Sequence, residues 1–379
     1  MYLKFDRHEK AKAMSNASTN KTKLPESGVL SAIKLEFEAV NAATIDDQGK
    51  GRIIDHITKV EVTDGGTNVM YSLTGQVARA LDFYHLKEVM PERCNIYDGK
   101  TQRTTVVIPF GEYVGDPKKG LDLGVWDEVN LEVTNDATTT LWADLALKAD
   151  IQLITMQELP APPASYYKHY QWRSEKPSAD GQYVRHQLPV NDKIRRYIIQ
   201  ADPDMAAAGS IAQDPIGDSY LLDFSFNERT KYVMKDARPK DILRLNALQY
   251  GRVQAQTLVK QSTTVYYDLA MAYVENIAAV NRSDGTLTTS LIGLHDSNDR
   301  AQVSRTIDVG GERIDISAIG LGYYHTFVPF DSMSGDEMTF LNPAKTAGGM
   351  GAVYADWYGY KDDHTFRSIL TVPKKQGET

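Results

Sequence analysis

The feature that most constrains this chain is a strict alternation of apolar and charged residues. It is clearest at residues 33–39, which read Ile-Lys-Leu-Glu-Phe-Glu-Ala. Because successive side chains of a β-strand point to opposite faces, only a strand gathers these apolar residues on one side. Further strand-like runs occur at residues 57–62, 68–73, 104–108, 129–133, 145–156, 195–199, 220–226 and 231–234. Many short strands predict an all-β fold, a sandwich or a barrel.

In each half, turns and one helical segment are predicted between the strands. Gly65-Gly66 join two of the runs into a hairpin, and Gly310-Gly311 do the same within residues 306–316. Apolar residues recur at helical spacing at 76–86 and again at 239–250, where Pro239 suits a helix start. We therefore expect one short helix in each half.

A proline-rich stretch divides the chain. Residues 158–165 contain Pro160, Pro162 and Pro163, which cannot join the interior of a sheet and favour an extended spacer. A chain of 379 residues has room for two domains. We expect four parts, namely an N-terminal arm at 1–24, a first β-domain at 25–157, the linker at 158–165 and a second β-domain at 166–379.

Three local matches recur in the same order in both halves, which indicates an internal duplication. Residues 108–111 match 328–331, residues 127–131 match 336–340, and residues 142–144 match 354–356. The strand and helix at 69–84 also correspond to residues 231–250. The fold expected is two tandem eight-stranded jelly-roll β-sandwiches, each with a short helix. The second copy is longer, mainly between 251 and 322, where we expect enlarged, projecting loops.

The basic residues of the first 24 positions form the one candidate binding segment. The whole chain is acidic, with a net charge of -8, which argues against nucleic-acid binding. The arm reverses this balance and has too few apolar residues to build a core, so it is expected to be extended and dispensable for folding. Its basic residues are Lys4, Arg7, Lys10, Lys12, Lys21 and Lys23.

Sequence motifs for catalysis or for cofactor and metal binding are absent. The single cysteine, Cys94, cannot form an internal disulfide, and the eight histidines show no metal-ligand spacing. Carboxylates at 122, 127 and 128, or at 296 and 299, could bind Ca²⁺, but charged loops explain them better. The aromatic segment 166–172 favours a strand with a buried face and an interface face over a sugar platform. We expect no cofactor and no enzyme activity.

Several segments together resemble a known family. They are the entry to a strand at 24–30, the hairpin strand at 57–62, the Tyr-Ser-Leu-Thr-Gly start of a helix at 71–75, and Val-Ile-Pro-Phe-Gly at 107–111. They are similar to the double jelly-roll major capsid proteins of tailless, internal-membrane-containing icosahedral viruses of bacteria and archaea. The likeness covers residues 24–156 well and the second half mainly through the repeat.

This resemblance implies a structural role in a virion. Members of the family form homotrimers with pseudo-hexameric outlines that tile an icosahedral shell over a lipid membrane. It implies further contacts with vertex (penton) and minor capsid proteins, and it turns the basic arm towards the membrane or a neighbouring subunit. No apolar segment of signal-peptide length follows Met1, so synthesis in the host cytoplasm is expected.

Two other classes of function stay open from the sequence. One is a carbohydrate-binding or carbohydrate-cleaving β-sandwich, because a pair of catalytic carboxylates need not be close in sequence. The other is a minor virion protein such as a spike or vertex protein. The missing signal peptide disfavours the first, and the duplication without fibrous repeats disfavours the second.

Overall fold

The computed structural model divides the chain into two compact units. Unit 1 comprises Met1–Tyr170 and Pro373–Thr379, and unit 2 comprises Gln171–Val372. The structure describes residues 1–42, 53–66, 68–86, 92–93, 99, 101–176, 182–189, 194–203, 220–226, 231–237, 257–261, 264–268, 276–283, 286–293, 308–309, 312–313, 324–326, 354–359 and 364–377.

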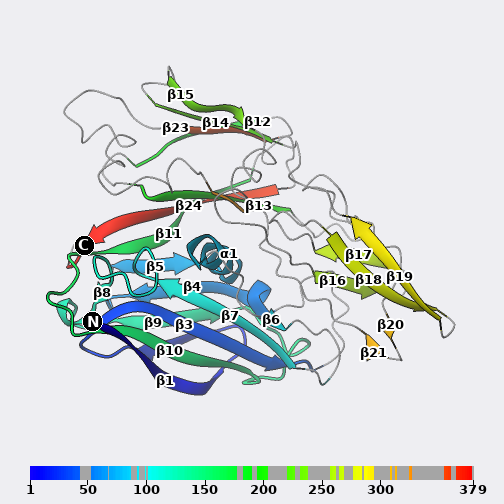
Figure 1. The fold of residues 1–379 in the computed structure, drawn as a ribbon, viewed down its shortest axis with the longest axis horizontal. Coiled ribbons are helices and arrows are strands. Elements are labelled where there is room, and N and C mark those ends of the chain that lie inside the picture. The colour runs from blue at the N-terminus through cyan, green and yellow to red at the C-terminus, as the bar shows by residue number, and fades with distance from the viewer. Residues whose placement is uncertain are drawn as a thin grey trace. The chain divides into compact units, whose positions relative to one another are not determined.

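Unit 1 is a jelly-roll with two facing sheets. In the first sheet the order of the main strands is β1-β10-β3-β7, and in the second it is β2-β9-β4-β5 (Figure 1). If these eight are numbered by chain position, the orders are 1-8-3-6 and 2-7-4-5, as in two Greek keys wrapped into a jelly-roll. The strands are β1 (Tyr2–Met14), β2 (Thr19–Lys23), β3 (Val29–Val40), β4 (Ile57–Thr63), β5 (Val69–Leu73), β7 (Thr101–Pro109), β9 (Asn130–Asn135) and β10 (Leu147–Gln157).

Four short elements complete unit 1. The strand β6 (Glu92–Arg93) extends the first sheet beyond β7, and β8 (Leu121–Asp122) pairs with β3. Single helical turns, η1 (Ile53–His56) and η2 (Leu123–Val125), precede β4 and follow β8.

The core lies between the two sheets and follows the predicted alternation. On β3, the side chains of Ile33, Leu35 and Phe37 are fully buried, whereas the intervening charged residues are half-buried. Val60 on β4 and Leu131 on β9 are also fully buried, in the second sheet. The all-β fold predicted from period-two patterning is therefore confirmed.

The helix predicted at 76–86 is present as α1 (Gly75–Leu86). The Thr74 hydroxyl oxygen accepts a hydrogen bond from the backbone N–H of Val77, which caps its first turn. Gly75 permits a close approach, because a Cβ there would lie 2.8 Å from the backbone oxygen of Ile54. The helix buries Val77 and Leu81 against the jelly-roll. Residues 239–250, the second predicted helix, lie outside the described residues.

Unit 2 repeats the jelly-roll order of unit 1. The strands run β11-β24-β13-β22 in one sheet and β12-β23-β14-β15 in the other, again 1-8-3-6 and 2-7-4-5 by chain position. Figure 1 shows β12, β23, β14 and β15 side by side. The strands are β11 (Ser165–Glu175), β12 (Gln182–Gln187), β13 (Arg196–Pro203), β14 (Tyr220–Phe226), β15 (Lys231–Ala237), β22 (Tyr324–Thr326), β23 (Tyr354–Gly359) and β24 (His364–Lys375).

The enlarged part of the second copy lies between β15 and β22. Its described residues form three two-stranded hairpins, so the expected loops contain regular structure. The hairpin predicted within 306–316 is confirmed at its described residues, since β20 pairs antiparallel with β21. The hairpin strands are β16 (Thr257–Gln261), β17 (Thr264–Asp268), β18 (Asn276–Ser283), β19 (Thr286–Gly293), β20 (Asp308–Val309) and β21 (Glu312–Arg313).

Strand positions confirm the duplication and correct part of its alignment. The first five strands of the two copies begin 162–167 positions apart, and the last three begin 217–224 apart, as strand start numbers show. The increase reflects the insertion between β15 and β22. The matched segments at 142–144 and 354–356 are not equivalent, because the first lies between β9 and β10 whereas the second lies within β23. Residues 328–331 and 336–340 lie outside the described residues.

The prediction of a separate N-terminal arm at 1–24 is corrected by the structure. Strand β1 pairs with β10 from Tyr2 to Met14, and β2 pairs with β9 from Thr19 to Lys23. They are the first two of the eight jelly-roll strands, so the first β-domain begins near Tyr2 and not at residue 25. Composition misled the prediction because backbone hydrogen bonds, not apolar burial, order most of an exposed edge strand.

The boundary between the units does not lie at the predicted proline linker, residues 158–165. The chain leaves unit 1 within β11, after Tyr170, and returns within β24, at Pro373. The beginning of β11 is held by unit 1, where the Tyr167 N–H donates to the oxygen of Phe110 at 2.8 Å. The C-terminal residues belong to unit 1 because the Gln376 side-chain nitrogen donates to the Gly120 oxygen at 2.6 Å.

Candidate assembly surface

The predicted basic residues lie on two strands, β1 and β2, that belong to different sheets of unit 1. Lys12 links the two strands, because its ammonium donates to the backbone oxygen of Lys21 at 2.8 Å and to the Thr22 hydroxyl. His8 adds a second link, with its ring nitrogen 2.8 Å from the backbone oxygen of Lys23. The structure therefore gathers the six basic residues along one border of the jelly-roll.

Most of these basic groups have carboxylate partners within unit 1. Arg7 forms an ion pair with Asp150 at 2.7 Å, and Lys4 pairs with Asp6 at 3.0 Å. The remaining ion pairs are Lys21 with Glu128 and Glu132, and Lys23 with Glu26. Within the described part of the chain, Lys10 alone of the six has neither a hydrogen bond nor an ion pair. The border is thus a mixed-charge surface and not a purely basic one.

This pairing shifts the pKa values of two side chains, Lys23 and Glu128. The hydrogen bond to Glu26, together with its negative charge, raises the pKa of Lys23. The hydrogen bond from Asn130, helped by the charges of Lys21 and Lys23, lowers the pKa of Glu128. Both groups are exposed, so screening by salt weakens these interactions and they contribute little to stability.

Large apolar side chains are exposed along the same border. Phe5 is 67% exposed and Tyr2 is 53% exposed, both on β1. Leu3, between them, packs instead beside Gly115, where a Cβ would lie 3.3 Å from its side chain. Tyr113, in the loop after β7, is 55% exposed. Exposed aromatic residues on a sheet edge are typical of surfaces that contact another protein.

Asn135 fastens the turn between β1 and β2 to the loop after β9. Its side-chain oxygen accepts hydrogen bonds from the backbone N–H groups of Ala17 and Ala137, at 3.1 and 3.2 Å. Its side-chain nitrogen donates to the backbone oxygen of Ser15 at 3.0 Å. Asn135 is only 2% exposed, so these bonds are shielded from water. The first two strands are therefore fixed to the rest of the jelly-roll at this end.

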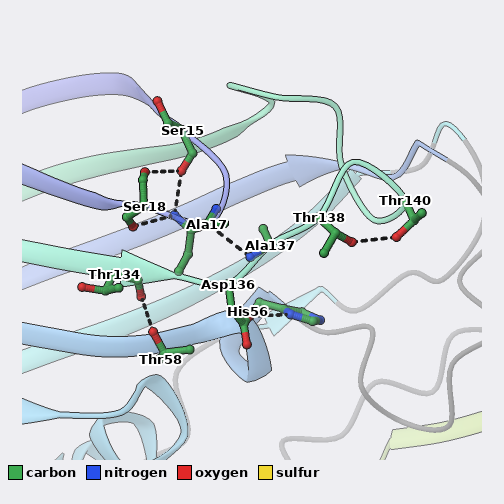
Figure 2. Close-up of polar contacts among 11 residues, drawn as sticks. Ser15, Ala17, Ser18, His56, Thr58, Thr134, Asp136, Ala137, Thr138 and Thr140 are labelled. Carbon is green, nitrogen blue, oxygen red and sulfur yellow. Dashed lines mark hydrogen bonds and ion pairs between the residues drawn. The ribbon is translucent and has the colours of Figure 1, made fainter.

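Further polar contacts hold the same end together, as Figure 2 shows. The Thr58 hydroxyl donates to the backbone oxygen of Thr134, and His56 lies 2.9 Å from a carboxylate oxygen of Asp136. The His56 ring also contacts Trp142 edge-on, with ring centroids 5.4 Å apart. These contacts give the histidine a structural role.

Helix α1 closes the opposite edge of the first sheet. Among the described residues, β6 covers β7 only at Arg103 and Thr104. Beyond β6, Arg79 donates to the backbone oxygen of Thr105 at 2.5 Å, and Asp82 accepts from the Val107 N–H at 2.8 Å. Two side chains of α1 thus replace a neighbouring strand, which hides an edge that is prone to aggregation.

The Asp82 carboxyl pays a desolvation penalty at this position. Burial raises its pKa well above the usual range, although the hydrogen bond from Val107 and the charge of Arg79 act in the opposite direction. Arg79 is 2% exposed and Asp82 is 1% exposed, so both side chains lie inside the protein. A charge buried in this way is costly, and the positive charge of Arg79 offsets part of that cost at Asp82.

The aromatic segment predicted at 166–172 is a strand with a buried face, within β11. Tyr166 and Tyr167 are buried, and the buried His169 ring nitrogen lies 3.1 Å from the backbone oxygen of Pro109. The ring of Tyr166 contacts Trp126 edge-on. The two buried tyrosine rings cannot stack on a sugar, whereas Tyr170 and Trp172 of the same segment are half-buried.

Of the candidate calcium ligands at 122, 127 and 128, two are engaged in local structure, namely Asp122 and Glu128. Asp122 accepts a hydrogen bond from the Gly124 N–H at 3.0 Å and caps η2. Glu128 accepts one from the Asn130 side chain at 2.7 Å. The residues at 296 and 299, and Cys94, lie outside the described residues. In the described ranges, no group of three or more histidine, cysteine or acidic residues is arranged to hold a metal ion.

Among the helices that the structure describes, none is both long enough and apolar enough to cross a membrane.

Comparison with known proteins identifies the fold by structure alone. No protein-family model and no curated protein sequence matches the chain. The crystal structure of the STIV MCP superposes with a TM-score of 0.58 and 10% identity, over 98% of this chain and 97% of that one. The major capsid protein P2 from bacteriophage PM2 gives a TM-score of 0.52 and 9% identity, over 99% and 97%.

A third solved structure agrees with these two. The atomic structure of Sulfolobus Turreted Icosahedral Virus matches with a TM-score of 0.56 and 9% identity, over 98% of this chain and 90% of that chain. At such low identity the likeness establishes the fold. The chain has the double jelly-roll fold of major capsid proteins.

Sequence reasoning missed two important features of unit 1. Asn135 and Asp82 each hold backbone groups of distant segments, and neither stands in a recognisable motif. A partial signal for Asp82 is its spacing of three from Arg79 on an otherwise apolar helix face, which predicts that the two side chains lie near each other.

Proposed function

We propose that this chain is a major capsid protein that assembles into the shell of an icosahedral virion. The observation that carries the proposal is the repetition of one jelly-roll order in both halves of a single chain. The full-length structural likeness to the capsid proteins of STIV and bacteriophage PM2 supports it. One jelly-roll occurs in proteins of many functions, but two matching copies suit a subunit that must occupy several similar positions.

The building block we propose is a homotrimer. Three chains with two jelly-rolls each place six similar bodies around a three-fold axis, and such an outline tiles a surface with few gaps. Large contacts between the flanks of jelly-rolls can be buried without pairing of strand edges. We expect obligate interfaces of more than about 2,000 Å² in total.

We further propose that the border formed by β1 and β2 contacts an internal membrane or a neighbouring capsid protein. Its basic residues contribute on the order of 1 kcal/mol each near an anionic surface when they are not neutralised. The four ion-paired residues weaken that attraction, whereas Lys10 is available for it. Binding of the full-length protein to anionic vesicles that is lost at high salt supports membrane contact. If a Lys10→Ser variant binds equally well, Lys10 does not contribute to that contact.

The proposed role is structural and includes no turnover of substrate. Vertex and minor capsid proteins are further proposed partners, and the virion is the proposed location. A specific hydrolysis of glycans, esters or phosphates that disappears when one carboxylate is changed would overturn this part of the proposal.

Electron microscopy of the purified full-length protein tests the proposal. We expect particles with three-fold symmetry and a six-lobed outline, because each chain supplies two bodies of the same fold. Two-lobed particles without symmetry, seen at the same concentration, would contradict it. The insertion between β15 and β22 offers an internal mark, since a tag placed there should appear on three of the six lobes.

A further inference from the structure

Strand β1 presents a free and regular edge. Among the described strands it pairs only with β10 and stands last in its sheet. Tyr2–Arg7 pair with β10 without interruption, whereas the register shifts between Arg7 and Glu9 and again before Lys12. Unpaired N–H and C=O groups on such an edge are a template for one more strand. The usable stretch is therefore Tyr2–Arg7.

The geometry of antiparallel pairing limits how a second copy of β1 can add to this edge. Residues of a strand send their N–H and C=O groups alternately to one side and to the other. In a two-fold symmetric pair, a residue whose N–H and C=O groups point to the partner must face a residue of the partner that does the same. The numbers of the two facing residues therefore add up to a constant even number. Within Tyr2–Arg7, the registers centred on Lys4 or Phe5 pair five residues of each strand, whereas those centred on Leu3 or Asp6 pair only three.

The charge pattern selects one of these registers. Centring on Lys4 or on Asp6 places two like charges directly opposite each other, which is destabilising. Centring on Phe5 places Lys4 opposite the partner's Asp6 on both sides of the axis. The existing ion pair between Lys4 and Asp6, at 3.0 Å, shows that both side chains lie on one side of the strand. The four charges would then alternate in sign.

The same register covers exposed apolar surface. Phe5 is 67% exposed, and on the axis its ring would meet the partner's Phe5. Aromatic residues that face each other across antiparallel strands stabilise the pair, and alternating charges disfavour shifted registers and unrelated strands.

We propose that two copies of this chain join through their β1 strands, paired antiparallel and centred on Phe5. Such a contact uses the same surface on both partners, so it closes as a two-fold and cannot build a three-fold ring. If the proposed function holds, β1 joins neighbouring capsomers and does not join subunits within one capsomer; only this placement rests on the proposed function.

A cysteine scan across the axis reads the register directly. In a full-length Cys94→Ser background, which removes the single cysteine, Lys4, Phe5 and Asp6 are each changed to cysteine in turn. Residues opposite each other have Cα atoms about 4.5–5.5 Å apart, within the range of a disulfide. We expect Phe5→Cys to give cross-linked dimers under mild oxidation.

The other two positions serve as matched controls. In the proposed register each lies about 8 Å from its own copy, which is too far for a disulfide, although all three positions are exposed. Preferential cross-linking at Lys4→Cys or Asp6→Cys would overturn the register. Equal cross-linking at all three positions, or none at any, would overturn the contact.

A charge exchange provides an independent check of the same pair. Lys4→Asp places acids opposite the partner's Asp6, and we expect association to weaken by about tenfold or more, which corresponds to about 1.4 kcal/mol. Combining Lys4→Asp with Asp6→Lys restores opposite charges, so association should recover. A double variant as weak as the single one would overturn the pairing, provided that circular dichroism shows both to be folded.

The mass of the protein separates this inference from the proposed function. Trimers that form without a Phe5→Cys cross-link between them would leave the capsid role standing and remove the β1 contact. Simple dimers cross-linked at Phe5→Cys, with no trimer, would keep the contact and remove the capsomer.

Discussion

The two jelly-rolls share one strand order but differ in the connection between their fifth and sixth strands. In the first copy this connection covers residues 74–100, and in the second it covers residues 238–323. The first contains α1, which closes the edge of β7, and the described residues of the second form three additional hairpins. The difference shows that the eight-strand framework tolerates large additions at this position. Strands β1 and β2, in contrast, are part of the framework itself.

The largest expected effect comes from removing residues 1–24. This deletion takes away β1 and β2, two of the eight strands of unit 1, together with the buried side chains of Met14 and Leu24. We expect loss of cooperative folding of unit 1, because the cost approaches the entire stability of a typical domain, about 5–15 kcal/mol. Thermal unfolding followed by circular dichroism measures it.

A deletion of larger size in the second copy is the matched control. Replacing residues 255–316 with a short Gly/Ser linker removes the hairpins and none of the sixteen jelly-roll strands. We expect both jelly-rolls to remain folded. If the N-terminal deletion were tolerated and the excision were not, the comparison between the two copies would be wrong.

A smaller effect is expected from Asn135→Ala. The change leaves the backbone N–H groups of Ala17 and Ala137 without their acceptor in a buried site, so we expect a loss of roughly 2–3 kcal/mol in the free energy of unfolding. Denaturant titration provides the measurement. Thr138→Ala, in the exposed part of the same end, should change it by less than about 0.5 kcal/mol. Equal effects would show that Asn135 does not hold the first turn.

Asp82 predicts a pH dependence specific to the first copy. Its folded-state pKa is raised by burial, so its favourable contribution is fully present below the ordinary pKa of about 3.9 and is lost as the pH rises through the folded-state value. The isosteric Asp82→Asn should remove that loss, and the stability gained over the wild type should grow with pH. Asp236→Asn, at an exposed position in β15, is the matched control for the loss of one carboxylate. A wild-type profile parallel to that of Asp82→Asn would contradict the account.

The smallest expected effects are at two basic residues of β1, the exposed Lys10 and the half-buried Lys12. Lys10→Ala should leave the free energy of unfolding within about 0.5 kcal/mol of the wild type, because no contact is lost. Lys12→Ala should cost about 1 kcal/mol, since it removes the link from β1 to β2. The difference between these neighbouring lysines, measured by chemical denaturation, tests whether β1 is an integral strand.

Much of the fold could be predicted because local patterns reflect it directly. The alternation at residues 33–39 and the helical spacing at 76–86 correspond to β3 and α1. The role of residues 1–24 could not be predicted in this way, because an edge strand is ordered by its backbone and keeps polar side chains in water. The partners of Asn135 and Asp82 are also hidden, since Ala17 lies in the turn between β1 and β2 and Val107 lies on β7, both far away in sequence.

The mass of the full-length protein in solution tests the central claim most directly. One chain has a mass of 42.3 kDa, so a homotrimer has three times that mass, about 127 kDa. We predict that light scattering at micromolar concentration finds this species and that dilution does not readily dissociate it, as expected for an obligate interface. A protein that stays at the mass of one chain over the same range would contradict the account of a self-assembling capsid subunit.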